Sequence, residues 1–157
     1  MNELPDITKA TALKQLSSFL TYRVSRLHGK LNAQATKILS NAVGITLNQW
    51  RMIAFIGGAQ QITASQLISI TALDKGLVSR NIKSLIEANY VVSTPHETDS
   101  RVHLLRLTAS GRKIYETALP RMRRRQADLR KNISADDIET FLRVTDALEA
   151  ASEDRSS

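Results

Sequence analysis

The chain contains no cysteine, so disulfides, thiolate metal sites and cysteine redox sensing are excluded. Aromatic residues make up only 4% of its 157 residues, so a core would depend mainly on Leu, Ile, Val and Ala. No apolar run approaches about 18 residues, the length that would span a membrane. The first residues, Met1 to Asp6, lack the basic region and apolar stretch of a secretory signal. We therefore expect a soluble, cytoplasmic protein.

Patterns typical of catalysis or metal binding are also missing from the chain. It has no nucleophile elbow, no Walker loop and no dinucleotide-binding glycine pattern. Its three histidines, His28, His96 and His103, have no spacing that suggests metal ligands. We therefore expect no enzyme activity, no metal and no cofactor. With 42% hydrophobic and 24% charged residues, the composition is that of one ordinary globular core.

The net charge of +7 is unevenly distributed along the chain. Residues 1–73 carry seven Lys and Arg against two Asp and Glu, giving +5, and residues 74–131 carry thirteen against six, giving +7. Residues 132–157 carry two against seven, giving −5. A basic body with an acidic tail indicates a polyanionic partner such as nucleic acid, with an anionic membrane surface as a weaker alternative.

The stretch from Asp74 to Tyr90 has the pattern of a short helix with two different faces. Four residues share one helical stripe: Val78, Ile82, Leu85 and Asn89. Four small or basic residues fall on the other side: Gly76, Ser79, Arg80 and Lys83. Asp74 is a natural N-cap, because its carboxylate can accept from the free amides of the first turn. Taken alone, the pattern fits an ordinary surface helix as well as a binding helix.

The neighbouring segments favour the binding helix. Thr63 and Gln66 match a capping box that opens a short helix just before Asp74, which makes a helix-turn-helix pattern. Residues 90–94 and 102–107 predict two strands around a polar turn, and a hairpin here makes the motif a winged one.

Amphipathic helices are predicted on both sides of this winged unit, from Leu13 to Val43 and from Thr108 to Leu148. The expected fold is mainly α with a small β-hairpin (α+β), a winged helix-turn-helix flanked by N- and C-terminal dimerisation helices. We expect residues 1–44 and 109–157 to dimerise and residues 45–108 to bind DNA, within one continuous domain. The alternative is that the terminal helices fold back on the winged unit of a monomer.

Three local strings resemble the MarR family of bacterial transcription regulators. Residues 74–80 (DKGLVSR) resemble the start of that family's recognition helix, and residues 46–50 (TLNQW) resemble the entry to the helix before the motif. The third string resembles the family's wing signature; it consists of Asp99 and Arg101, followed by Leu104, Leu107, Thr108 and Gly111. The resemblance implies a homodimer on a pseudo-palindromic operator, a repressor released by a small aromatic or phenolic effector. Many members carry two or three arginines at the wing, where this chain has one.

Eight residues are predicted to contact DNA: Ser65, Lys75, Gly76, Ser79, Arg80, Lys83, His96 and Arg101. Arg80 is the strongest of them, because its planar fork can bind a guanine edge or a phosphate through two hydrogen bonds. Arg101 is expected to enter the minor groove, with Asp99 as the ion-pair partner that holds it. Arg121 to Arg125 are interpreted as a solvated helix flank that steers DNA at long range, in preference to direct contact.

No effector site is assigned from the sequence. The aromatic, sulfur-containing or basic candidates are Tyr22, Arg23, His28, Met52, Phe55 and Tyr115, and for each a plain core or surface role is the simpler interpretation. The leading hypothesis is a sequence-specific double-stranded DNA-binding transcription regulator. The alternatives are a winged-helix protein-interaction module and an architectural DNA-binding protein without sequence preference.

Overall fold

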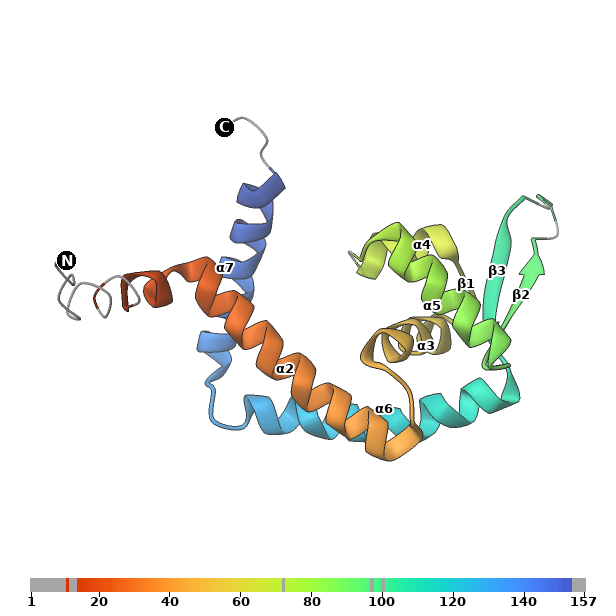
Figure 1. The fold of residues 1–157 in the computed structure, drawn as a ribbon, viewed down its shortest axis with the longest axis horizontal. Helices are drawn as coiled ribbons and strands as arrows, with labels where there is room; N and C mark the ends of the chain where they lie inside the picture. The colour runs from red at the N-terminus through yellow and green to blue at the C-terminus, as the bar shows by residue number, and fades with distance from the viewer. Residues whose placement is uncertain (1–10, 12–13, 72, 97, 100, 154–157) are drawn as a thin grey trace, which may run out of the picture. The chain divides into compact units, whose positions relative to one another are not determined.

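The computed structural model describes residues 11, 14–71, 73–96, 98–99 and 101–153, which form helices and a small antiparallel sheet (Figure 1). The elements in chain order are α2 (Leu20–Val43), α3 (Leu47–Ala59), β1 (Ile62–Thr63), α4 (Ala64–Thr71), α5 (Lys75–Glu87), β2 (Val91–Pro95), β3 (His103–Leu107), α6 (Ala109–Arg130) and α7 (Ala135–Glu153). The chain divides between Leu119 and Pro120 into two compact units. The predicted fold class is confirmed.

Short polar side chains cap the helices that surround the winged motif. At α3, Thr46 Oγ1 accepts from the Gln49 amide at 3.2 Å and Gln49 Oε1 accepts from the Thr46 amide at 2.9 Å. Thr63 and Gln66 make the same reciprocal pair at the start of α4, at 3.1 and 2.9 Å. These bonds satisfy amide groups that have no partner inside the helix, so the sequence sets where each helix begins. The capping box predicted at Thr63 and Gln66 is confirmed.

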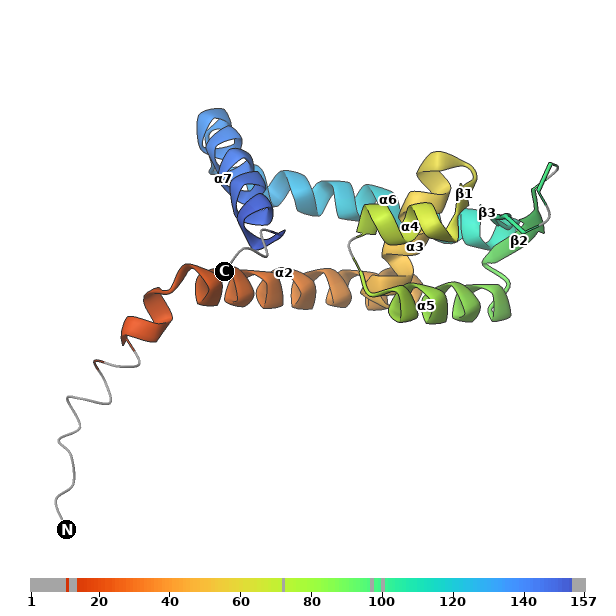
Figure 2. The same cartoon turned by 90° about the horizontal axis from the view of Figure 1, so that it is seen from above.

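The sheet has three antiparallel strands in the order β1-β3-β2, with β3 in the centre. The predicted hairpin is formed by β2 and β3, in which Ser93 pairs with Leu105, and Leu105 also pairs with Ile62 of β1. Strand β1 could not be predicted from the sequence, because two residues carry no alternating pattern. Figure 2 shows the hairpin beside α4 and α5. The wing is therefore a hairpin whose second strand also pairs with a third strand.

The core of the first unit is built around α3. Met52, Ile53 and Ile56 have no exposed surface, and α3 contacts α2, α4, α5 and the sheet. Since buried aliphatic side chains contribute roughly 1.5–3 kcal/mol each, this one helix fixes the positions of the elements that form the winged motif.

Several predicted helix limits differ from the structure. The helix predicted from Leu13 to Val43 is interrupted at Phe19, whose extended backbone (ψ 134°) precedes α2, and α2 is then continuous through Gly29. Helix α3 extends past Gly57 and Gly58 to Ala59. Helix α5 ends at Glu87, so Asn89 is outside the buried stripe; it is exposed and left-handed, with φ 58°. Asparagine tolerates that conformation better than most residues, which explains its place at this turn.

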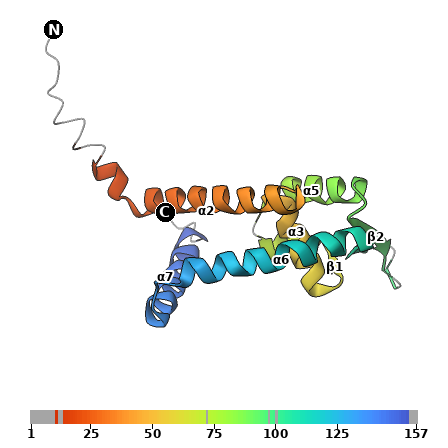
Figure 3. The ribbon, with the colours of Figure 1, turned by 90° about the horizontal axis from the view of Figure 1, so that it is seen from below.

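The second unit begins at Pro120 and contains the end of α6, a short connection and α7 (Figure 3). Pro120 lies inside α6, which is assigned as one helix to Arg130. Ser134 Oγ accepts from the Asp137 amide at 3.1 Å and so caps α7. Among the described residues, no helix is both long and apolar enough to cross a membrane.

Candidate nucleic-acid interface

Helix α5 is fixed in the first unit by its buried side. Val78 and Leu85 have no exposed surface and Ile82 is only 8% exposed. Asp74 Oδ1 accepts from the Leu77 amide at 2.9 Å, which defines the first turn. The predicted cap and the predicted buried stripe at these three positions are therefore confirmed, and the opposite face is held toward solvent.

The exposed side of α5 carries the predicted basic and small residues. Lys75, Ser79, Arg80 and Lys83 are exposed, and Gly76 is half-buried between them. A Cβ at Gly76 would lie 3.2 Å from Arg80 Nη1, so the guanidinium lies over the first turn of the helix. A planar guanidinium at this place can give two parallel hydrogen bonds to one acceptor group.

Lys83 has an acidic neighbour on α5 that was not predicted from the sequence. Its Nζ lies 3.9 Å from Glu87 Oε1, with the two side chains 78% and 66% exposed. An ion pair this exposed contributes little to stability and leaves Lys83 able to exchange partners. The sequence feature that indicates this ion pair is the i, i+4 spacing of a lysine and a glutamate on one helix face.

The structure brings Ser65 and Arg101 together, although they are far apart in the sequence. Both line a cavity of about 600 Å³ between the first turn of α4 and strand β3, which His103 also lines. Two potential hydrogen-bond donors and a cation therefore face one space large enough for a phosphate group. His103 was not among the predicted DNA contacts. Its position on a strand, two residues after Arg101, is the sequence feature that could have indicated it.

The tip of the wing is held by hydrogen bonds to its backbone. Asp99 Oδ1 accepts from the Arg101 amide at 3.0 Å, and the Val102 amide donates to the Asp99 carbonyl at 3.0 Å. These two wing residues are both described by the structure, and the expected ion pair between them is replaced by this turn-closing bond. Asp99 therefore supports the wing through hydrogen bonds to its backbone. Its carboxylate does not neutralise the exposed Arg101 guanidinium.

His96 lies at the other end of the wing turn and is half-buried. Its Nδ1 accepts from the Thr98 amide at 3.3 Å and lies 3.0 Å from Thr98 Oγ1. A neutral ring that accepts at Nδ1 carries its proton at Nε2, which makes that nitrogen a donor. The predicted role of His96 as a phosphate contact is chemically compatible with this arrangement.

Two of the six effector candidates belong to the core instead. Met52 is fully buried, and the Tyr115 ring stacks on Trp50 with 6.2 Å between ring centroids. The Arg112 guanidinium also lies over the Tyr115 ring, 5.5 Å from its centroid. The remaining four candidates are all exposed: Tyr22, Arg23, His28 and Phe55. Among the described residues, no group of three or more His, Cys, Asp and Glu could hold a metal ion.

A capped helix with a buried back and an exposed basic front, followed by a three-stranded wing, defines a winged helix-turn-helix protein. Residues 43–102 match a model described as the MarR family. The crystal structure of a MarR/EmrR family transcriptional regulator from Acinetobacter sp. ADP1 is 25% identical, with a TM-score of 0.77 over 85% of this chain and 94% of that chain. The winged unit of the chain is therefore similar to that of MarR-family transcription regulators.

Two further relatives extend the comparison. The multiple antibiotic resistance protein MarR of Salmonella typhimurium is 27% identical over 122 residues, covering 75% of this chain and 85% of that protein. A mutant MarR from E. coli, crystallised in complex with operator DNA, is 25% identical with a TM-score of 0.65, covering 83% of this chain and 99% of that chain.

Proposed function

We propose that this chain is a sequence-specific double-stranded DNA-binding transcription regulator that acts as a homodimer on a pseudo-palindromic operator. The observation that carries the proposal is helix α5, whose buried back holds an exposed front of Lys75, Ser79 and Arg80. A helix of this kind fits the major groove with its N-terminal residues at the base edges. Its likeness to a MarR structure that contains operator DNA supports the same use.

The proposed contacts divide into two groups. Ser79 and Arg80 meet base edges, and Gly76 allows the helix to approach closely. Arg101 enters the minor groove, where a narrow groove concentrates negative potential. The phosphate contacts are made by Ser65, Lys75, Lys83 and His96. Phosphate contacts fix the register, whereas the base and groove contacts provide specificity.

The proposed dimer is supported by large apolar side chains that are exposed on the terminal helices. Phe19, Leu20 and Val24 are at least half exposed in the first unit, as are Phe141 and Leu142 in the second. Contiguous exposed apolar residues on a regulator are typical of an interface between copies. We therefore propose that the helices within 1–44 and 109–157 form the dimer.

Analytical ultracentrifugation tests the dimer directly. The wild-type chain is expected to sediment as a dimer, and Leu20→Asp is expected to raise the monomer fraction because it places a charge in the apolar interface. Thr21→Asp, which adds the same charge to an exposed polar position of α2, is the matched control. Identical dimer dissociation constants for the two variants would contradict the proposed interface.

We propose that the protein represses transcription and that a small aromatic or phenolic effector relieves this repression, as the resemblance to the MarR family implies. A reporter gene behind a selected operator tests this. Expression is expected to fall when the protein is present and to recover with effector. Raised expression on adding the protein would overturn repression while leaving DNA binding intact.

The DNA-binding proposal is tested by selecting bound fragments from the source genome and measuring the affinity of the enriched sequence by fluorescence anisotropy. The selection is expected to return one two-fold symmetric motif. Its binding constant should fall steeply with salt, with a log–log slope of about −0.9 for each phosphate neutralised. Enrichment of unrelated fragments would favour an architectural protein, and no affinity at low salt would favour a protein-interaction module.

A further inference from the structure

His103 lies where the wing meets helix α4, and it is not among the proposed DNA contacts. Strand β1 pairs Thr63 with Leu104, and α4 begins at the residue after Thr63. This pairing places the first turn of α4 beside the start of β3, so Ser65 and His103 line one cavity of about 600 Å³. Side chains alternate along a strand, so His103 shares the face of β3 on which Leu105 is buried.

The chemistry of this cavity suits an anion. None of its seven lining residues is acidic, and Arg101 is the one permanent cation among them. Ser65 is exposed, and within the described part of the chain its hydroxyl makes no hydrogen bond. A hydroxyl, a guanidinium and an imidazole are all groups that can donate to the oxygens of one phosphate.

The His103 ring is held in a way that suits both of its charge states. Its Nδ1 lies 3.2 Å from Ser93 Oγ of β2, which leaves Nε2 for a ligand. The hydroxyl can donate to Nδ1 of the neutral ring or accept from Nδ1 of the protonated ring, so gaining a proton requires no rearrangement. Protonation adds a positive charge beside the cavity, and a phosphate accepts more strongly from an imidazolium than from a neutral ring.

His96, the other histidine of the wing, lacks this freedom. Its Nδ1 accepts from the Thr98 amide at 3.3 Å. A backbone amide can only donate, so a proton on Nδ1 would break that hydrogen bond. His96 can therefore contact a phosphate as a neutral donor, whereas His103 is arranged to strengthen its contact by taking up a proton.

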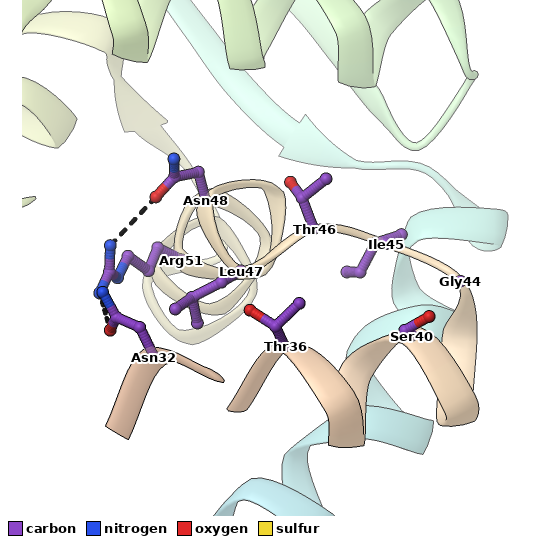
Figure 4. A pocket seen from close by; sticks show the side chains of 9 residues that line it. All are labelled: Asn32, Thr36, Ser40, Gly44, Ile45, Thr46, Leu47, Asn48 and Arg51. Atoms are coloured by element: carbon purple, nitrogen blue, oxygen red, sulfur yellow. Dashed lines mark hydrogen bonds between the residues drawn. The ribbon is translucent and has the colours of Figure 1, made fainter. Parts of the chain in front are cut away.

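The elements packed against β3 add no acidic group beside His103. Helix α4 and strands β1 and β2 contain no charged or titratable side chain, and α3 contains Arg51 alone. Arg51 donates to Asn48 and to Asn32 (Figure 4). On β3 itself, Arg106 donates to Gln61 Oε1 at 2.6 Å. The charged groups on these elements are all cations, so a bound phosphate would be the anion that stabilises protonated His103.

We propose that the cavity between α4 and the wing holds one phosphate of the DNA backbone in each half-site, and that His103 contacts it most strongly when protonated. DNA binding is then coupled to proton uptake, so affinity rises as the pH falls through the range in which histidine gains its charge. This inference rests on the proposed function, because the phosphate belongs to the operator.

Fluorescence anisotropy with the selected operator at about pH 6 and about pH 8, at one ionic strength, tests the coupling. The wild-type dimer is expected to bind about tenfold more tightly at the lower pH, or about threefold for each His103. His103→Gln keeps a polar side chain that cannot be protonated, so it should lose most of this ratio. The same ratio in the wild type and in His103→Gln would overturn the proposal.

The other two histidines supply the controls. His28→Gln, at an exposed position of α2, should keep both the wild-type affinity and the wild-type pH ratio. His96→Gln should change the affinity by the same factor at both pH values. A pH ratio that is lost in His96→Gln and kept in His103→Gln would assign the coupling to the wrong histidine and contradict the inference.

A second measurement identifies the phosphate and needs only the wild-type chain. Each phosphate of one operator half-site is replaced in turn by a methylphosphonate, which carries no charge. At one position the replacement is expected to lower the pH ratio from about tenfold to about threefold, because one of the two His103 contacts is lost. If no position lowers the ratio, the proposal is overturned even if His103→Gln fails to fold.

The outcomes also separate this inference from the proposed function. If the wild type binds no duplex at either pH, the proposed function fails and this inference fails with it. If the wild type binds its operator with a pH ratio that His103→Gln leaves unchanged, this inference fails alone.

Discussion

Replacing Gly111 by alanine tests the packing that attaches the wing to helix α6. Gly111 is buried in the first turn of α6, and a Cβ there would collide with the carbonyl oxygen of Tyr90, the residue before β2. That carbonyl also accepts from the Thr108 amide at 3.1 Å, so it cannot rotate away freely. Overpacking costs about 1–3 kcal/mol, and a collision with fixed backbone belongs at the upper end. For a chain of this length, about 3 kcal/mol lowers the Tm by roughly 6–12 °C.

Thermal unfolding followed by circular dichroism at 222 nm, at one protein concentration, measures the effect. Gly58→Ala is the matched control, because Gly58 is exposed within α3 and a Cβ there would have no neighbour within 4 Å. Alanine in place of a helical glycine should raise stability by about 0.5–1 kcal/mol. A Gly111→Ala variant as stable as the wild type would refute the proposed collision.

Three further substitutions test the DNA contacts and one strained residue. Arg80→Ala should cost about 1–3 kcal/mol of operator affinity and reduce discrimination between the operator and single-mismatch duplexes, as measured by anisotropy; undiminished discrimination would exclude it from base contact. Arg101→Ala should weaken binding of all these duplexes by a similar factor, and unchanged binding would remove the wing from the interface. Gln60 ends α3 with φ 66°, where a Cβ is strained, so Gln60→Gly should stabilise the protein by about 1 kcal/mol in urea unfolding. A loss of stability would show that the Gln60 side chain contributes more than the strain costs.

The features predicted well from the sequence are those set by local chemistry. Asp74 caps α5 because its carboxylate reaches an amide three residues later, a distance fixed within the segment. The buried stripe at Val78, Ile82 and Leu85 follows from helical spacing alone. Asn89 shows the limit of that argument, because its spacing fits the stripe although the helix has already ended.

The features missed from the sequence depend on contacts between distant segments. Strand β1 exists because Ile62 and Thr63 pair with Leu105 and Leu104 across the fold. Arg51 of α3 donates to Asn32 Oδ1 of α2 at 3.3 Å, and no local pattern links these two residues. Asp99 was expected to pair with the Arg101 side chain, because an acidic group cannot approach DNA usefully, but in this tight turn its carboxylate accepts from the Arg101 backbone amide.

The ratio of affinities for the selected operator and for a scrambled duplex of the same length and base composition tests the central claim most directly. Both are measured by competition at about 0.15 M salt, where nonspecific phosphate binding is weakened. The account predicts that the operator binds about a thousandfold more tightly or better, with two chains on each duplex. Equal affinity for the two duplexes would contradict sequence-specific recognition by helix α5.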